Sequence, residues 1–470
     1  MDFSNFLMMQ QEAGLIIVFL FLLFYDLFGS EKSKNYFRLT ACLLFGIHTF
    51  AGFIPHETGV AFGGMYITSN MTVLMKNILN IGTLLVLMQS GQWLRSSDVK
   101  VREGEFYIIM LATLVGMYLM VSAANFMLLY IGIEAASLPL ACLVAYNKYK
   151  EKSAEAGAKF ILISALSSGV MMFGISFLYG ATGTMYFTDM APVLTYSPMV
   201  IMGLVFFFAG LGFKISLVPF HLWTADVYEG APTGVTAYLS AISKGAASFA
   251  LLFALYSVFQ NVSIVWHHIL WVLSVLTIVV GNLFAIRQKD IKRFFAFSSI
   301  SQAGYIMVGV INGTPEGMTA TVYYVLVYLL ANLAIFGVIT AVENKSGRTD
   351  IAAYSGFYKS NPKLALVMML AVFSLAGIPP LAGFFSKFFI FASAAAQEEY
   401  VLVFIALVNT VVALYYYLLI IKAMFITQEE EQGIGRVKTD VYNKITLLFC
   451  SAAVIVVGFL SYIYEYILSI

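Results

Sequence analysis

Six lysine residues lie inside long apolar stretches of this chain, where a charged side chain is costly. They are Lys76, Lys159, Lys214, Lys244, Lys387 and Lys422. An ionisable group at the centre of a bilayer costs about 2.5–3.5 kcal/mol on insertion scales, so several of them in one chain indicate a function that moves charge. With Glu134, a carboxylate near the centre of another apolar stretch, they are the candidates for chemistry.

Glu134 and the central lysines are predicted to form a proton-carrying set. A carboxylate at that depth must be neutral or paired with a cation, and Lys214 and Lys244 lie at similar depth. One carboxylate cannot neutralise three central lysines, so some lysines must be uncharged part of the time. At an effective dielectric constant of ~20, a charge 4 Å away contributes about 4 kcal/mol, and this falls with distance. We therefore interpret Glu134, Lys214, Lys244 and Lys387 as a row of coupled proton sites. A static ion pair that fixes helix packing is the alternative.

The other lysines in apolar stretches are weaker candidates. Lys159 and Lys422 lie within about four residues of helix ends, where a lysine can extend its amine to the interface. Lys159 stays a possible member of the proton row. Lys76 lies near one end of its stretch and has no assigned role.

The composition indicates an integral membrane protein of the all-α class. Of the 470 residues, 61% are hydrophobic and 11% charged, whereas soluble domains contain about 25% charged residues. No basic segment with interleaved aromatics suggests a nucleic-acid partner. The three cysteines, Cys42, Cys142 and Cys450, have no CxxC spacing, and no nucleotide or metal motif is present, so we expect this chain to bind no cofactor or metal.

Apolar windows predict fourteen membrane helices. Their ranges are 14–29, 37–54, 70–90, 105–122, 125–146, 157–180, 198–223, 233–259, 264–286, 292–311, 318–342, 364–396, 400–426 and 445–469. Six alternate loops (30–38, 91–104, 147–156, 287–293, 343–363 and 427–444) hold the other 20 Lys and Arg residues. The positive-inside rule makes these loops cytoplasmic and both termini periplasmic.

One loop on the predicted cytoplasmic side breaks this pattern. The loop between the seventh and eighth spans contains Asp226 and Glu229 and no base, which marks it as functional. His221, just before it, is placed to pass protons between water and Lys214. A structural hydrogen bond between His221 and the acidic loop is the alternative.

Two of the predicted spans are interrupted by glycine and proline. The seventh contains Gly210, Gly212 and Pro219, and the twelfth contains Gly377, Ile378 and two prolines. Proline removes a backbone donor and clashes with the preceding turn, so both helices should break at mid-depth. The breaks lie five helices apart, which predicts inverted repeats of spans 4–8 and 9–13. Two unrelated kinks are the alternative. The predicted division is 1–104, 105–259, 260–426 and 427–470.

Three motifs resemble a known family. They are FKISLVPFHLW at 213–223 continuing into DVYEGAPT at 226–233, SSISQAGY at 298–305, and GIPPLAGFFSKF at 377–388. They are similar to those of the antiporter-like proton-channel subunits of respiratory complex I (NADH-quinone oxidoreductase), and the DVYEGAPT form resembles subunit N. Three positions depart from the family pattern: Ala225 and Gly234 replace prolines, and Gln302 stands where a histidine is common.

The resemblance implies a function within a larger complex. It implies a membrane-arm subunit that moves protons while a peripheral redox arm uses NADH and quinone. Implied partners are the M- and L-type subunits, small membrane subunits and the bilayer, in a bacterial inner membrane. The positions matching Glu134, Lys214, Lys244 and Lys387 form the family's proton relay. A multisubunit cation/proton antiporter and a structural scaffold without pumping are the alternatives.

Overall fold

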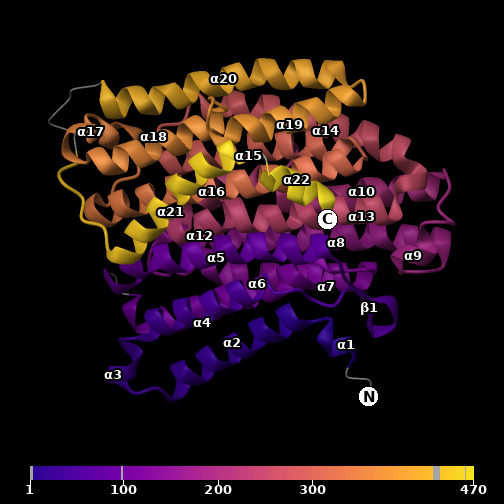
Figure 1. Ribbon diagram of the computed structural model, residues 1–470, viewed down its shortest axis with the longest axis horizontal. Coiled ribbons are helices and arrows are strands. Elements are labelled where there is room, and N and C mark those ends of the chain that lie inside the picture. Colours follow the sequence, from indigo (N-terminus) through magenta and orange to yellow (C-terminus); the bar gives the residue numbers. More distant parts are fainter. Residues whose placement is uncertain (1–3, 97–98, 427–433, 461) are drawn as a thin grey trace.

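The computed structural model describes residues 4–96, 99–426, 434–460 and 462–470, so parts of the predicted loops 91–104 and 427–444 lie outside the described residues. Within these ranges, twelve helices are long and apolar enough to cross a membrane. Three shorter apolar helices, Phe37–Ala51, Pro362–Ala376 and Ala382–Ala396, accompany them. Figure 1 shows the long helices running side by side. The all-α, polytopic class predicted from the sequence is confirmed.

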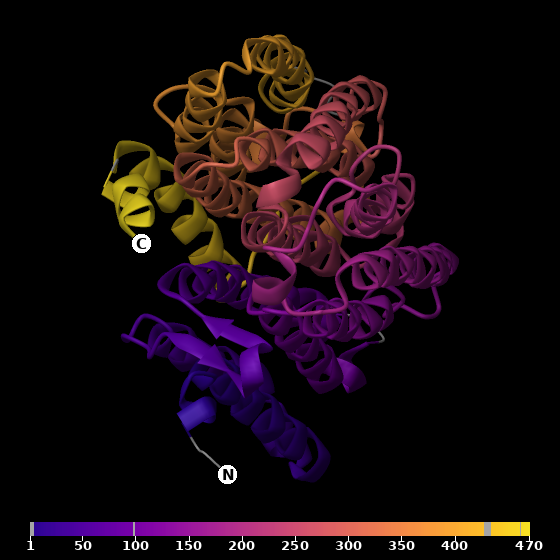
Figure 2. The ribbon, with the colours of Figure 1, turned by 90° about the vertical axis from the view of Figure 1, so that its right-hand side faces the viewer.

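The N-terminal segment contributes two of the long apolar helices, α2 and α5, one of the shorter ones, α4, and a small hairpin. Its elements are α1 (Ser4–Leu7), α2 (Gln10–Phe28), α3 (Glu31–Lys34), α4 (Phe37–Ala51), β1 (Gly59–Ala61), η1 (Phe62–Gly64), β2 (Tyr66–Thr68) and α5 (Asn70–Ser96). The two strands pair antiparallel, with Val60 opposite Ile67. In the end-on view of Figure 2, this segment forms one edge of the bundle, and α18 to α20 lie toward the opposite edge.

The next elements correspond to predicted spans four to eight. They are η2 (Lys100–Arg102), α6 (Glu103–Val121), α7 (Phe126–Val144), α8 (Glu151–Thr182), α9 (Phe187–Met190), α10 (Pro198–Ile215), α11 (Trp223–Gly230), α12 (Thr233–Tyr238), η3 (Leu239–Ser243) and α13 (Lys244–Val258). The eighth span contains a feature that the sequence did not predict: η3 is a π-helical turn that ends directly before Lys244. Such turns occur often at functional sites.

The remaining elements correspond to spans nine to fourteen. They are η4 (Gln260–Val262), α14 (Ser263–Ala285), α15 (Ile291–Ile311), α16 (Pro315–Ser346), η5 (Ile351–Tyr354), α17 (Phe357–Ser360), α18 (Pro362–Ala376), α19 (Ala382–Ala396), α20 (Tyr400–Phe425), α21 (Val441–Phe459) and α22 (Tyr462–Ser469). The last predicted span, 445–469, was wrong as a single helix, since α21 ends at Phe459 and α22 follows separately.

Both predicted helix breaks are present. The seventh span ends at Ile215, and Ser216 adopts a left-handed conformation with φ of 67° before α11 begins. The twelfth span stops at Ala376, where Gly377 has φ of 86°, and resumes as α19. Each break therefore leaves a helix end with free carbonyl groups inside the bundle.

The two groups of five spans share several local features. Their third helices, α8 and α16, each have 32 residues and end at a left-handed glycine, Gly183 and Gly347. Their first two helices cross at small residues in both groups. A Cβ on Gly116 of α6 would lie 2.2 Å from the Ala136 nitrogen of α7, and one on Gly281 of α14 would lie 2.6 Å from the Ser301 nitrogen of α15. These parallels support inverted repeats, while the division at residues 104, 259 and 426 stays a prediction.

One end of the bundle gathers basic loops. Figure 1 shows α3 and α17 toward the left, and β1 and α9 toward the right. The start of α8 and the start of α15 lie beside α11, because Lys152 and Arg293 both bind Glu229. We call the end formed by α3, α11, α17 and the starts of α8 and α15 the basic end.

Candidate proton-transfer site

Lys214 lies in the last turn of α10, just before the break. Its ammonium nitrogen donates hydrogen bonds to the hydroxyls of Ser137 on α7 and Ser164 on α8, the latter at 2.7 Å. Ser137 is one turn beyond Glu134 on the same helix, so the carboxylate acts on Lys214 from nearby. The two side chains form no direct ion pair, and Oε1 of Glu134 is enclosed without a hydrogen-bond partner among the described residues. Both residues are half-buried, on a flank of the bundle.

Lys244 is buried at the centre of the molecule. It is the first residue of α13, directly after the π-helical turn, and its side chain is 2% exposed. Its nitrogen donates a hydrogen bond to Ser299 of α15 at 2.8 Å and lies 5.4 Å from the centre of the Tyr228 ring. The partner of this lysine is therefore a hydroxyl, as it is for Lys214.

Lys387 occupies the second helix break. Its nitrogen donates to the carbonyl oxygens of Leu375 and Ala376, at 2.9 and 3.3 Å, which are the carbonyls left free where α18 stops. It also lies 4.9 Å from the centre of the Tyr305 ring. The break predicted from the prolines thus supplies the polar partners of the buried amine.

A polar cluster joins Lys244 to Lys387. Tyr328 of α16 lies near Ser299, and its hydroxyl accepts a hydrogen bond from Asn332 at 2.6 Å. Tyr328 also lines a small internal cavity of about 10 Å³, the size of one water molecule, together with Gln302 and Lys387. Tyrosine and asparagine occur in many contexts, so nothing in the sequence singled out Tyr328 or Asn332.

Gln302, which stands where a histidine is common in the family, belongs to this cluster. The Tyr324 hydroxyl donates to its carbonyl oxygen, and its amide donates to the Tyr417 hydroxyl at 3.3 Å. Gly234, another departure from the family pattern, lies in α12 so close to Ser90 that an added Cβ would be 2.4 Å from the serine oxygen.

His221 lies between α10 and α11 and is buried. Its Nδ1 has no hydrogen-bond partner among the described residues. The lysine charge that acts on the ring is that of Lys244. Electrostatically, His221 is thus coupled to Lys244, and its predicted transfer of protons between water and Lys214 stays a prediction.

The acidic loop is neutralised by bases on the neighbouring helices α8 and α15. Asp226 binds Lys159 at 2.7 Å and Arg293 at 2.8 Å, while Glu229 binds Lys152 at 2.7 Å and Arg293 at 2.8 Å. Partial burial acts to raise the pKa of each carboxyl, but the hydrogen bonds from these bases prevail and lower both pKa values. The loop needs no base of its own because three others supply them.

Two of the remaining lysines in apolar stretches are more exposed, and the membership of Lys159 in the proton row stays a prediction. Lys159 is 38% exposed and pairs with Glu155 at 2.5 Å as well as with Asp226. Lys422 is exposed in the last turn of α20.

Lys76 has a carboxylate partner that sequence reasoning missed. Its nitrogen lies 2.5 Å from Oε1 of Glu12 and donates to the Tyr66 hydroxyl at 2.9 Å. Glu12 precedes the predicted first span, but α2 begins at Gln10 and brings it into the protein. The available signal was an acidic residue directly beside an apolar run.

Comparisons with known proteins agree with the family resemblance of the three sequence motifs. The family described as NADH:quinone oxidoreductase/Mrp antiporter matches residues 123–413. The chain is 60% identical to NADH-quinone oxidoreductase subunit N of Azobacteroides pseudotrichonymphae, covering 99% of this chain and 98% of the relative. It is 53% identical to subunit N of Phocaeicola vulgatus, with coverage of 99% and 98%.

Solved structures share the fold. A chain of respiratory complex I from Thermus thermophilus with bound aureothin has a TM-score of 0.81 at 29% identity, covering 96% of this chain and 97% of that one. A chain of the Mrp complex from Dietzia has a TM-score of 0.85 at 19% identity, with coverage of 100% and 96%, and this likeness concerns the fold alone. With relatives this similar along nearly its whole length, the chain belongs to the subunit N family of NADH-quinone oxidoreductase.

Proposed function

We propose that this chain is a proton-translocating membrane-arm subunit of NADH-quinone oxidoreductase. Protons move through Glu134, Lys214, Lys244 and Lys387, driven by NADH oxidation and quinone reduction in other subunits. In this proposal the redox centres belong to those other subunits. The described residues of this chain contain no group of three or more His, Cys, Asp or Glu side chains that could hold a metal ion. NADH and quinone are substrates of the whole complex.

One observation supports the proton row above the others. The ammonium groups of Lys214, Lys244 and Lys387 donate to hydroxyls or backbone carbonyls, and no carboxylate of a described residue lies within 4 Å of them. Lys76, in contrast, is held by Glu12. A carboxylate at contact distance stabilises the charged form of a lysine and so makes loss of its proton costly. A neutral partner has no charge and does not add this cost.

The neutral partners suit both protonation states. A hydroxyl accepts a hydrogen bond from an ammonium and can donate one to a neutral amine. The Ser137 and Ser299 hydroxyls donate to the carbonyl oxygens of Ile133 and Ala296, so each would rotate toward its lysine when the amine loses its proton. A neutral amine has two N–H groups, and Lys387 has two carbonyl acceptors. The third proton of its charged form would face the cavity shared with Tyr328.

The half-buried Glu134 and Lys214 support contact with another subunit. A charged flank at this depth must be covered by protein or water. We propose that a neighbouring membrane-arm subunit, of the M/L type or a small membrane subunit, covers it. We further propose that the complex lies in the bacterial inner membrane with both termini of this chain periplasmic, as the basic loops favour.

The test uses the whole complex in proteoliposomes. Lys214→Met and Lys244→Met should lower proton translocation per NADH oxidised. Lys422→Met is the control, because it makes the same substitution at an exposed lysine near the end of a long apolar helix. Wild-type translocation in both central variants, with normal assembly, would support the scaffold reading. Translocation that requires sodium would support the antiporter reading.

A further inference from the structure

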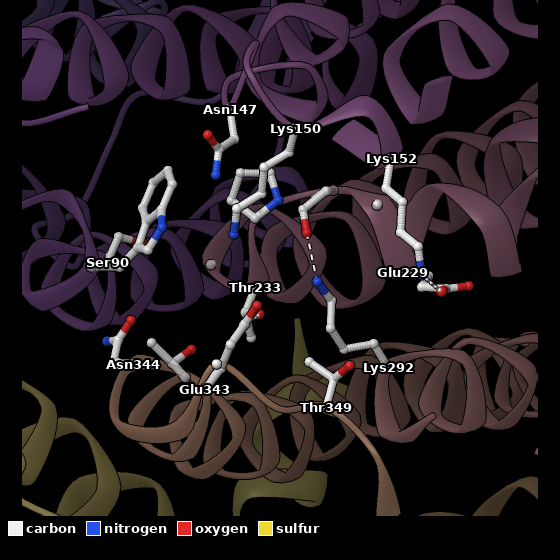
Figure 3. Close-up of a pocket in the computed structure, with 17 residues that line it drawn as sticks. Ser90, Asn147, Lys150, Lys152, Glu229, Thr233, Lys292, Glu343, Asn344 and Thr349 are labelled. Atoms are coloured by element: carbon white, nitrogen blue, oxygen red, sulfur yellow. Dashed lines mark hydrogen bonds and ion pairs between the residues drawn. The ribbon is translucent and has the colours of Figure 1, made fainter. Parts of the chain in front are cut away.

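A cavity opens at the basic end, between α5, α12, α15 and α16. Its volume is about 160 Å³, enough for several water molecules. Its walls include Ser90, Lys150, Thr233, Lys292, Glu343 and Asn344. Figure 3 shows Glu343 beside Thr233, with Lys150 and Lys292 on other sides of the cavity.

Glu343 is the carboxylate in this cavity that has no ion-pair partner. The Thr233 hydroxyl donates a hydrogen bond to it, and within the described ranges no base lies within 4 Å. Glu229, which also lines the cavity, is bound by Lys152 and Arg293. The amine of Lys292 is engaged with the Ala231 carbonyl oxygen at 2.7 Å.

The other titratable groups around Glu343 come from each neighbouring element. The cavity walls contribute Lys150, Lys152, Glu229 and Lys292. The η5 turn contributes Tyr354, whose phenol is fully buried and close enough for the Glu343 charge to act on it. None of these bases forms an ion pair with Glu343, so its carboxylate faces the cavity with the Thr233 hydroxyl as its hydrogen-bond donor among the described residues.

Polar side chains continue from this cavity toward Lys244 along two facing helices. Thr233, Ser240 and Lys244 follow one another at spacings of seven and four residues, which keeps them on one helix face. On α16, Glu343, Asn332 and Tyr328 follow at eleven and four residues. The two rows are linked where Thr233 meets Glu343 and where Ser240 donates to Asn332 at 2.9 Å.

An apolar part of α16 lies between the cavity and the polar cluster. Thr340 lines the cavity, and Asn332 lies eight residues earlier on α16, about 12 Å along the helix. Between them Phe336 and Ile339 are fully buried. Proton transfer along this part therefore requires water to enter it transiently.

We propose that Glu343 collects protons at the basic end and supplies them to Lys244 along water that enters transiently and is held by the Asn332 and Ser240 side chains. In each cycle the Glu343 carboxyl releases one proton inward, Lys244 gains one, and Glu343 takes a replacement from cavity water. This inference rests on the proposed function, since it concerns how protons reach the lysine row.

The test compares Glu343→Gln with Glu343→Asp in proteoliposomes containing the whole complex, after assembly has been checked. Glu151→Gln is the matched control, because Glu151 is an exposed glutamate in the first turn of α8 at the same end. Glu343→Gln should slow proton translocation several-fold, and more at about pH 8 than at about pH 6.5, because uptake then depends on scarcer protons in bulk water. Glu343→Asp should restore most of the rate.

Two further variants separate the possible outcomes. Thr233→Val, which removes only the hydroxyl partner, should produce a smaller slowing with the same pH trend. If Glu343→Gln matches Glu151→Gln while Lys244→Met abolishes translocation, the uptake role is wrong and the proton row stands. A loss in Glu343→Gln that is equal at every pH and unrelieved by aspartate shows a structural role and overturns the inference. Unchanged translocation in Lys244→Met as well overturns both proposals.

Discussion

The nitrogen of Lys76 lies 2.5 Å from a carboxylate oxygen of Glu12, and these two side chains are 0% and 1% exposed. This pair joins α5 to α2, so it ties the N-terminal helix to the bundle. Two buried charges in contact are costly to desolvate, but each becomes far more costly once its partner is lost.

Glu12→Gln should therefore destabilise the chain by about 3–5 kcal/mol, since Lys76 would be buried without a counter-charge. The double variant Glu12→Leu with Lys76→Met should recover most of that loss. Thermal unfolding of the purified complex, followed by release of this subunit, measures the effect. Glu465→Gln, at an exposed position of α22, is the control. If Glu12→Gln and Glu465→Gln lowered stability equally, the ion-pair account would be contradicted.

Gly377 has a conformation and a contact that a larger residue should disturb. Its φ of 86° costs about 1 kcal/mol for alanine, and an added Cβ would lie 3.2 Å from Cδ of Lys387. Gly377→Ala should therefore lower both stability and proton translocation.

Gly183→Ala is the matched control for this substitution. Gly183 has φ of 72°, so alanine there has a similar backbone cost, but no atom lies within 4 Å of the added Cβ. It should lower stability by a similar amount and leave proton translocation per NADH unchanged. Equal loss of translocation in both variants would show that the Lys387 contact is irrelevant.

Arg293 should control the acid stability of the basic end. The pKa values of Asp226 and Glu229 are lowered in the folded chain, so their ion pairs stabilise it above the ordinary carboxyl range and this stability is lost as pH falls through the lowered pKa values. Arg293→Gln should move both pKa values back up, so acid destabilisation should begin at higher pH.

Thermal unfolding of the complex between about pH 7 and about pH 4 measures this shift. The effect at neutral pH should be modest, about 1 kcal/mol or less per pair, because the partners are partly exposed. Lys289→Gln, at an exposed base directly before α15, should leave the pH dependence unchanged. A similar shift in both variants would indicate a general charge effect.

The sequence allowed the helix breaks to be predicted and the lysines in apolar stretches to be singled out, because both signals are local. Proline excludes a continuous helix wherever it stands, and a lysine in an apolar run is visible without any tertiary information. Glu12 was missed because the start of α2 was placed four residues too late. The carbonyl partners of Lys387 and the hydroxyl partner of Lys244 depend on how separate helices pack, which residue type alone does not specify.

Tyr328 provides the sharpest test of how the central lysines communicate. It is the residue that both lies near Ser299, the partner of Lys244, and lines the cavity next to Lys387. Tyr328→Phe keeps the ring and removes only the hydroxyl, so packing should change little while the Asn332 amide loses its acceptor, at a cost of about 1–3 kcal/mol.

We expect Tyr328→Phe to slow proton translocation several-fold with little loss of assembled complex, because the hydroxyl that can pass a proton between the two lysine sites is gone. Tyr323→Phe, on the same helix, is the control, since the Tyr323 hydroxyl donates instead to the Val457 carbonyl oxygen at 3.0 Å. Proton translocation per NADH oxidised, measured in proteoliposomes, compares the two. If the variants behave alike, protons pass between Lys244 and Lys387 through water alone, and the cavity beside Lys387 must then hold more than the single molecule it fits.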